Sequence, residues 1–425
     1  MRRRVMRIHF LVLFRGLRGG GINGIIVSDK CMGGTVKRIL LLSVMLMVFA
    51  SLLPALGITV IVNDDGGNGK SYSDGEYADA SLYASGSFTY DGDSVDTVNV
   101  SWRKGNVEVI QKKGKSFSVS ESGKGLSEAE SLHYLIKDRT LYIQFSRSGY
   151  DYTGRDEDKN LTLEIPEDVN LHVGTGTGDI TAAVLEVGTF SLSTASGRIA
   201  VDTVECDGNA YFTTSTGDVS VSSIEGEDVY FTSSTGDLTV SEIDGDSLYF
   251  TTYTGNITVE RADCDSAFVS TAGGRISFTN AECDKLSIST SYGNVTLKNV
   301  DVGGKLNLTG SSAECVFTDL NVMELDAVLS SGSLRAHNLR TDRIDLDTST
   351  GDVELSLMSD VNGDINTSGG NVSISRLQKN TKVIWQGKGT LSTGLDTSIK
   401  DGKTEIGRGD YTLSVTSTSG SLSID

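Results

Sequence analysis

The chain has 425 residues and a formal net charge of −19 at pH 7, with a sequence pI of about 4.7. This acidity argues against nucleic acid as a partner, because nucleic-acid binding depends on clustered Lys and Arg. The 5 Cys are too few for a fold held together by disulfides, and the length leaves room for two or three domains.

The N-terminal residues resemble a membrane-targeting segment. Residues 1–38 are basic, and residues 39–62 follow as a run of 24 residues without a charged side chain. Such a run can span a bilayer as a helix, and the positive charges before it favour a cytoplasmic N-terminus. We therefore expect a single-pass transmembrane helix in the cell membrane, with the rest of the chain extracytoplasmic. The alternative is secretion after cleavage of a signal peptide, and Met32 offers a second start of translation.

The next part of the chain is predicted to lead into a cap. Residues 63–80 are expected to be a linker, and residues 81–166 carry an irregular β pattern with a Lys-Gly turn at 104–105. Segments 132–136 and 141–145 are predicted to form a hairpin. An open strand edge at the end of a repeat stack invites aggregation, so this region is expected to cover the first repeat.

From residue 167 to residue 377 the sequence repeats with a period of 19 or 20 residues. Each unit is marked by the Gly that ends an S/T-x-G turn, once replaced by Ala: Gly178, Gly197, Gly217, Gly236, Gly255, Gly274, Gly293, Ala313, Gly332, Gly351 and Gly370. The positions five before and two after this marker are apolar in every unit. A fixed period with aligned apolar columns is typical of stacked supersecondary units.

The apolar positions alternate within each unit, which is typical of strands with one buried face. No single unit can bury that face, whereas eleven stacked units form a continuous internal column. The sequence therefore predicts an all-β fold, a parallel β-solenoid of about eleven coils preceded by one transmembrane helix. Residues 81–166 and 378–425 are expected to be its β caps. Parallel strands lie about 4.8 Å apart, so eleven coils make a rod roughly 50 Å long.

One family has the same local motifs. Leu163-Glu-Ile-Pro166, followed by Leu171-His-Val-Gly-Thr-Gly-Thr-Gly178-Asp-Ile, resembles the entry motif of the putative-adhesin β-repeat family of prokaryotes. The repeated S/T-x-G-D/N turns match it too, over roughly residues 90–425, although Ala313 departs from the pattern. The resemblance implies a solenoid in an extracytoplasmic setting, and it implies no catalytic residues.

Candidate catalytic and metal-binding groups are few. The four His, at positions 9, 133, 172 and 337, lack the spacing of metal ligands. The corners between strands are short and regular, whereas polysaccharide-active β-helix enzymes frame paired carboxylates with long loops. We expect a protein that is not an enzyme and has no cofactor or metal, with a polysaccharide-active enzyme as the least favoured alternative.

Other polar residues recur at fixed positions. The Asp or Asn that follows the marker Gly is expected to bond the local backbone. Cys264 and Cys283 occupy the same position in adjacent units, so a disulfide is geometrically feasible, although two small corner residues are the favoured interpretation. An acidic column six residues before the marker is either a cation site or a solvated face: Asp326, Asp345 and Asp364.

The favoured binding surface is a column of aromatic residues in four consecutive units, six residues before the marker: Tyr211, Tyr230, Tyr249 and Phe268. Side chains alternate along a strand, so these rings are expected to point away from the core. Hydroxyl residues accompany them four before the marker: Thr213, Thr232 and Thr251. Such a stripe can stack on sugar rings and hydrogen-bond to their edges, whereas the competing interpretation is that aromatic pairs only stabilise the sheet.

These features together predict a surface-anchored, non-catalytic, adhesin-like binding or scaffold protein that presents one rigid face. The expected partners are the membrane, through one helix, and a glycan, the cell wall or another surface protein. The alternative is a self-associating structural rod of the cell envelope, which would need open ends so that one rod can stack on the next.

Overall fold

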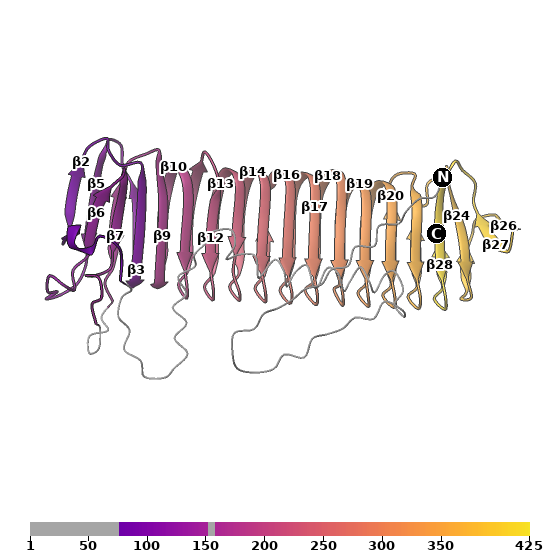
Figure 1. The fold of residues 1–425 in the computed structure, drawn as a ribbon. Coiled ribbons are helices and arrows are strands. Elements are labelled where there is room, and N and C mark those ends of the chain that lie inside the picture. The colour runs from indigo at the N-terminus through magenta and orange to yellow at the C-terminus, as the bar shows by residue number, and fades with distance from the viewer. Residues whose placement is uncertain (1–75, 152–157) are drawn as a thin grey trace, which may run out of the picture.

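The computed structural model describes residues 76–151 and 158–425, which form one long β rod (Figure 1). The predicted membrane-spanning run at 39–62 lies outside the described residues. Within the described ranges, no helix is long and apolar enough to cross a membrane. Apart from one short 3-10 turn, η2 (Ala80–Leu82), the regular elements of these ranges are 29 strands joined in one sheet.

The middle of the rod is a stack of parallel coils in register, with local irregularities at a few corners. Each strand pairs with the strand one repeat later, as in the pairs Phe212 with Phe231 and Phe231 with Phe250. This arrangement confirms the predicted parallel β-solenoid of about eleven coils. Its strands are β9 (Val169–Thr177), β10 (Ile180–Thr194), β11 (Ile199–Cys206), β12 (Ala210–Thr214), β13 (Val219–Thr232), β14 (Leu238–Thr252), β15 (Ile257–Val259), β16 (Ala262–Thr271), β17 (Ile276–Thr290), β18 (Val295–Gly310), β19 (Cys315–Leu329), β20 (Leu334–Thr348), β21 (Val353–Leu357), β22 (Asn362–Thr367) and β23 (Val372–Ser375).

The register places equivalent residues in columns inside the rod. Phe212, Phe231 and Phe250 are fully buried, and their rings stack with centroids 4.7 and 4.9 Å apart. A column of buried hydroxyls lies at the turn, where the Thr194 hydroxyl accepts a hydrogen bond from the backbone N–H of Gly197 at 3.0 Å. The equivalent hydroxyls of later coils do the same, whereas that of Thr175 in the first coil is buried without a partner. Because most of these buried hydroxyls are satisfied locally, a Ser- and Thr-rich sequence can still form a close-packed interior.

The marker Gly is required by the close approach of neighbouring turns. A Cβ built on Gly197 would lie 1.8 Å from the carbonyl oxygen of Gly178, and the other marker positions are similarly tight. Ala313 breaks the pattern where the usual turn hydroxyl is also absent, because Gly310 stands there instead. A Cβ on Gly310 would lie 3.3 Å from that of Ala313, so the missing side chain at Gly310 removes one close contact of the Ala methyl group.

At the N-terminal end the chain inserts a coil and doubles back. Strands β3 (Thr97–Lys104) and β4 (Val107–Gln111) pair in parallel with β9 and β10. A second coil, β7 (Thr140–Gln144) and β8 (Leu161–Ile165), lies on their other side. The region predicted as irregular therefore contributes two in-register coils, and the strands flanking the Lys104-Gly105 turn continue the stack.

Antiparallel strands cover this end of the rod. Strand β6 (His133–Lys137) forms the predicted hairpin with β7, and β5 (Ser116–Glu121) pairs antiparallel with β8. Strands β1 (Ala84–Ser85) and β2 (Phe88–Asp91) pair with β6 and β5. The change of direction ends the parallel stack, as a cap should.

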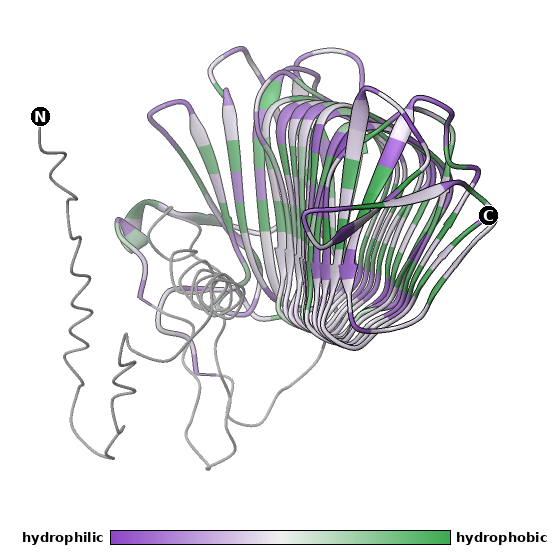
Figure 2. Cartoon of the chain, turned by 90° about the vertical axis from the view of Figure 1, so that its right-hand side faces the viewer, coloured by the Kyte–Doolittle hydropathy of each residue, from purple (hydrophilic) through white to green (hydrophobic). Residues whose placement is uncertain are grey.

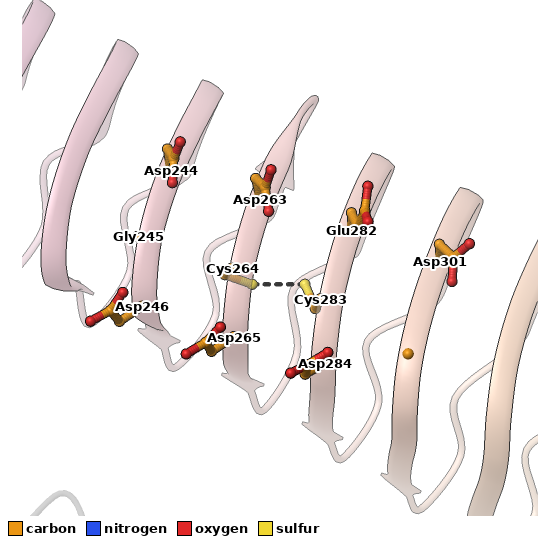
Figure 3. Close-up of a pocket in the computed structure, with 11 residues that line it drawn as sticks. Asp244, Gly245, Asp246, Asp263, Cys264, Asp265, Glu282, Cys283, Asp284 and Asp301 are labelled. Carbon is orange, nitrogen blue, oxygen red and sulfur yellow. Dashed lines mark hydrogen bonds between the residues drawn. The ribbon is translucent and has the colours of Figure 1, made fainter.

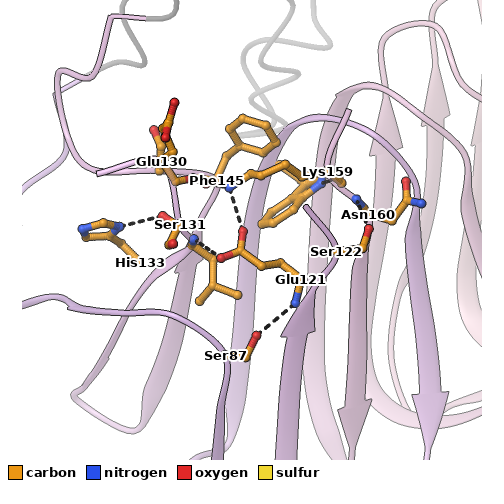
Figure 4. Close-up of polar contacts among 12 residues, drawn as sticks. Ser87, Glu121, Ser122, Glu130, Ser131, His133, Phe145, Lys159 and Asn160 are labelled. Atoms are coloured by element: carbon orange, nitrogen blue, oxygen red, sulfur yellow. Dashed lines mark hydrogen bonds and ion pairs between the residues drawn. The ribbon is translucent and has the colours of Figure 1, made fainter. Parts of the chain in front are cut away.

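A buried ion pair holds the N-terminal insertion together (Figure 4). The Lys159 ammonium is 2% exposed and lies 2.8 Å from the Glu121 carboxylate, which is itself buried. It also donates to the carbonyl oxygen of Glu130 at 2.6 Å, and it lies 4.1 Å from the ring centroid of Phe145. Because the charge is paired and its protons are used, burial of this Lys is tolerated.

The C-terminal end is built in the same way, with a segment that doubles back and antiparallel strands outside it. Strands β28 (Tyr411–Ser417) and β29 (Leu422–Ile424) lie between β22–β23 and the earlier strands β24 (Thr381–Gly387) and β25 (Leu391–Thr393). Strand β27 (Lys403–Ile406) then pairs antiparallel with β24, and β26 (Thr397–Lys400) with β27. The repeat thus continues through part of the predicted cap, and the coils nearly superimpose when viewed from this end (Figure 2).

Candidate functional site

The four predicted aromatic residues form one continuous row on the outer face of the rod. Tyr211, Tyr230, Tyr249 and Phe268 occupy register positions on β12, β13, β14 and β16. Successive ring centroids are 4.7, 4.5 and 5.2 Å apart, and the ring planes differ by 10°, 3° and 9°. We call this row the aromatic ladder.

Stacking determines which parts of the ladder a ligand can reach. The rings lie face to face along the rod, so Tyr230 and Tyr249 each have both faces covered by a neighbouring ring. The tyrosines present their edges and hydroxyl groups to solvent instead. The two end rings each have one neighbouring ring and a small residue on the other side, Ser191 beside Tyr211 and Ser287 beside Phe268. Phe268 is the more open of the two, because it is 43% exposed whereas Tyr211 is half-buried.

Beyond Phe268 the same outward column continues with smaller, polar residues, so the surface is lower there. Strand β17 presents Lys285, Ser287 and Ser289 on the same outward face, and Asn307 follows Ser287 in the column. We call Phe268 with this polar floor the Phe268 step. It combines one open aromatic face with hydroxyl, amide and ammonium groups within the width of two coils.

The predicted hydroxyl column lies where the sequence places it. Thr213, Thr232 and Thr251 pair in register beside the ladder, and none of them is buried. Burial, reinforced by the charge of Asp228 and by the neighbouring tyrosines, raises the pKa of Tyr230 to about 12. The Tyr230 hydroxyl is therefore a neutral hydrogen-bonding group at physiological pH.

The same column becomes acidic further along the rod. Asp326, Asp345 and Asp364 stand in register, and the Lys305 ammonium lies 3.1 Å from Asp326 and 2.9 Å from Glu324. Burial and the neighbouring carboxylates raise the pKa of Asp345. Within the described residues, no group of three or more His, Cys, Asp or Glu side chains is placed to hold a metal ion.

The Asp and Asn residues after the marker Gly serve the backbone. The Asp218 carboxylate accepts the N–H of Asp237 at 2.8 Å, and the Asp237 carboxylate accepts the N–H of Asn256 at 2.7 Å. Each side chain thus bonds the backbone of the next coil along the rod. The structural interpretation of this column is correct, with the difference that the bond connects two coils rather than closing one turn.

Two further acidic columns were missed by the sequence interpretation, and we call them the acidic corner. They lie eight and ten residues after the marker: Glu186, Glu205, Glu225, Asp244, Asp263, Glu282 and Asp301, with Asp207, Glu227, Asp246, Asp265 and Asp284. Part of the corner lines an open pocket of about 290 Å³ (Figure 3). Carboxylates in register repel one another, so the acidic corner is a region of concentrated negative charge that costs some stability. Extending the column alignment past the seventh position would have found it.

The coil register, the turn hydroxyls and the outer columns define a repeat protein of the parallel β-solenoid class. A family model described as Toastrack DUF4097 matches residues 95–268, 210–334 and 264–425. The chain therefore belongs to this family, and the match confirms the resemblance to a β-repeat family of adhesin-like proteins.

Other comparisons add less. A solved structure titled as a putative cell adhesion protein from Clostridium sporogenes is similar over 80% of this chain and 98% of that one. Its sequence identity is 8% and its TM-score is 0.14, so the likeness carries no argument about function. A comparison with curated proteins finds no match.

Proposed function

We propose that this chain is a non-catalytic, adhesin-like protein of the cell surface that binds carbohydrate on its outer face. The uncharged run at 39–62 would anchor it in the membrane, and the solenoid would present the aromatic ladder outside the cell. The observation that carries this proposal is the ring of Phe268, which ends the ladder beside the small Ser287 and, at 43% exposure, is the most exposed of the four rings.

The Phe268 step fits the chemistry of a sugar ring. A pyranose has an apolar face of C–H groups, which packs against an aromatic face, and a rim of hydroxyls. With its ring on Phe268, a sugar would lie above Ser287, within reach of groups that both donate and accept. Ser287 and Ser289 offer hydroxyls, Asn307 offers an amide and Lys285 offers an ammonium group.

The ladder behind Phe268 supports this role in a second way. Three rings stacked in register hold Phe268 in one orientation, because the ring cannot turn without losing its contact with Tyr249. A ligand face that is already fixed costs less ordering entropy on binding. The hydroxyls of Thr232 and Thr251 would then extend the surface for a longer oligosaccharide.

The ends of the rod argue against the alternative of a self-associating envelope rod. A parallel solenoid lengthens end to end only if its terminal strands are free to accept another parallel coil. Here antiparallel strands cover both ends, with β5 and β6 at one end and β26 and β27 at the other. A monomeric binding rod therefore fits the described residues better.

A glycan array probed with the full-length chain tests the proposal. We expect binding to a subset of oligosaccharides, and we expect Phe268→Ala to lose it. Tyr253→Ala is the matched control, because Tyr253 is a more exposed aromatic residue on a neighbouring turn, at 67% exposure. Absence of binding to any glycan, or equal binding by the parent and Phe268→Ala, would contradict a carbohydrate site at the step.

A further inference from the structure

Two cysteines face each other across adjacent coils in the acidic corner. Cys264 on β16 and Cys283 on β17 are register partners, and the Cys264 thiol donates to the Cys283 sulfur at 2.7 Å (Figure 3). Both side chains are buried. Register partners on parallel strands have Cα atoms about 4.8 Å apart, which lies within the range that a disulfide can bridge.

The other cysteines of the described ranges have no such neighbour. Cys206 has Gly226 as the equivalent residue of the next coil, and Cys315 belongs to a different column. Among the described cysteines, Cys264 and Cys283 are therefore the pair whose sulfur atoms lie side by side. That pair also has an approach route, because both cysteines line the open pocket of the acidic corner.

We propose that Cys264 and Cys283 form an inter-coil disulfide by exchange with a small cationic disulfide. The thiolate of one cysteine attacks the small disulfide, forms a mixed disulfide and releases one small thiol. The thiolate of the second cysteine then attacks the protein sulfur of that mixed disulfide and releases the second small thiol. The protein loses two protons and two electrons, and the small disulfide is reduced to two thiols.

The charge of the corner selects the oxidant. Seven carboxylates line the pocket around the two sulfurs: Asp244, Asp246, Asp263, Asp265, Glu282, Asp284 and Asp301. A cationic disulfide is concentrated at such a surface, whereas an anionic one is repelled. The hydrogen bond with Cys283, burial and the charges of Asp263 and Asp265 raise the pKa of the Cys264 thiol. Exchange should therefore be slow at neutral pH with any oxidant, and slowest with an anionic one.

The position of the pair gives the cross-link a structural consequence. Cys264 lies four residues before Phe268 on β16, and Cys283 lies four residues before Ser287 on β17. The disulfide would therefore join the two coils that form the Phe268 step. Coils of a solenoid are held mainly by their neighbours, so a covalent link at this point resists local separation of those coils. This inference does not depend on what the ladder binds.

Peptide mapping of the full-length chain tests the cross-link. Trypsin cleaves after Arg261, Arg275 and Lys285, so the two cysteines fall on separate peptides, 262–275 and 276–285. Reduced, folded protein is exposed to cystamine at low salt and digested without reduction. We expect these two peptides to be joined, and Cys264→Ser and Cys283→Ser to abolish the joined product. Cystamine attached to Cys264 without a cross-link, or no reaction at either cysteine, would overturn the proposal.

The rates of reaction with a cationic and an anionic oxidant test the selection by charge. At low salt the joined product should form about tenfold faster with cystamine than with oxidised glutathione, which is anionic, and high salt should remove the difference. The double variant Asp263→Asn, Asp265→Asn should reduce the difference in rate between the two oxidants at low salt. The joined product should still form in this variant. Equal rates with the two oxidants at low salt would refute the selection by charge.

Discussion

The two faces of the same strands carry two aromatic ladders of nearly identical geometry. Inside the rod, Phe212, Phe231 and Phe250 stack at 4.7 and 4.9 Å. Outside it, Tyr211, Tyr230 and Tyr249 stack at 4.7 and 4.5 Å, one residue earlier in each coil. Ring stacking is thus a consequence of the coil register and does not by itself identify a core or a site. The two ladders differ in their exposure to solvent and in the residues at which each one ends.

The inner ladder ends against other core side chains, whereas the outer ladder ends on an open face. Phe250 meets Phe278 edge to face at 6.0 Å, so the inner rings stay enclosed. Among the residues that the structure describes, no further ring meets Phe268 on the side of Ser287. Burial gives the inner ladder its stabilising role, whereas the exposed ring of Phe268 is the surface that we propose for recognition.

The largest expected effect is on the inner ladder. Phe231→Asp places an unpaired carboxylate between Phe212 and Phe250, and we expect a loss of several kcal/mol in unfolding free energy or a failure to fold. The milder Phe231→Ala should cost about 3–5 kcal/mol through the cavity it leaves. Urea denaturation followed by circular dichroism measures both, and a Phe231→Asp variant with unchanged stability would contradict the coil register.

The neighbouring residue on the outer ladder gives the matched comparison. Tyr230→Ala removes a ring of similar size from the same strand, but it leaves no buried cavity and loses only stacking contacts. We expect a cost of about 1 kcal/mol in the same denaturation experiment. If Tyr230→Ala and Phe231→Ala were equally destabilising, the outer ladder would be part of the core.

A smaller effect should appear at high pH. An unfolded Tyr ionises near pH 10, whereas Tyr230 in the folded rod has a pKa of about 12. The unfolded state therefore loses its proton first, so the stability due to protonated Tyr230 is complete below pH 10 and is lost as the pH rises towards 12. Unfolding free energies over this range should fall less steeply for Tyr230→Phe than for the parent. Identical slopes would show that Tyr230 is not perturbed.

Much of the fold could be predicted because its determinants are local and repeat. The marker Gly, the alternating apolar positions and the outward direction of Tyr211 and its equivalents all follow from one strand period. The order of the end coils could not be predicted in the same way. Val98, Val100, Val107 and Val109 fit the coil pattern around Gly105, yet no local signal shows that a later segment lies on the outer side of that coil.

The residues of the candidate site could be predicted from the sequence, whereas the way in which their rings stack could not. Sequence offsets give the face on which a ring lies, but the stacking of Tyr230 between Tyr211 and Tyr249 depends on side-chain torsions that no offset specifies. The sequence therefore predicted an outward aromatic stripe that can stack on sugar rings, without showing which ring faces are free. In the structure the column continues with a serine beyond each end ring, Ser191 beyond Tyr211 and Ser287 beyond Phe268, and Phe268 is the more exposed of these two rings.

The most direct test of the central claim compares two variants on one glycan identified by the array. Phe268→Ala removes the open face and keeps the tyrosines, whereas the triple variant Tyr211→Ser, Tyr230→Ser, Tyr249→Ser keeps Phe268 and its polar floor. Affinities measured by calorimetry should fall about tenfold or more for Phe268→Ala, equivalent to about 1.4 kcal/mol, and by less for the triple variant. Loss of binding in the triple variant with Phe268→Ala unchanged would contradict the claim that the ligand stacks on Phe268.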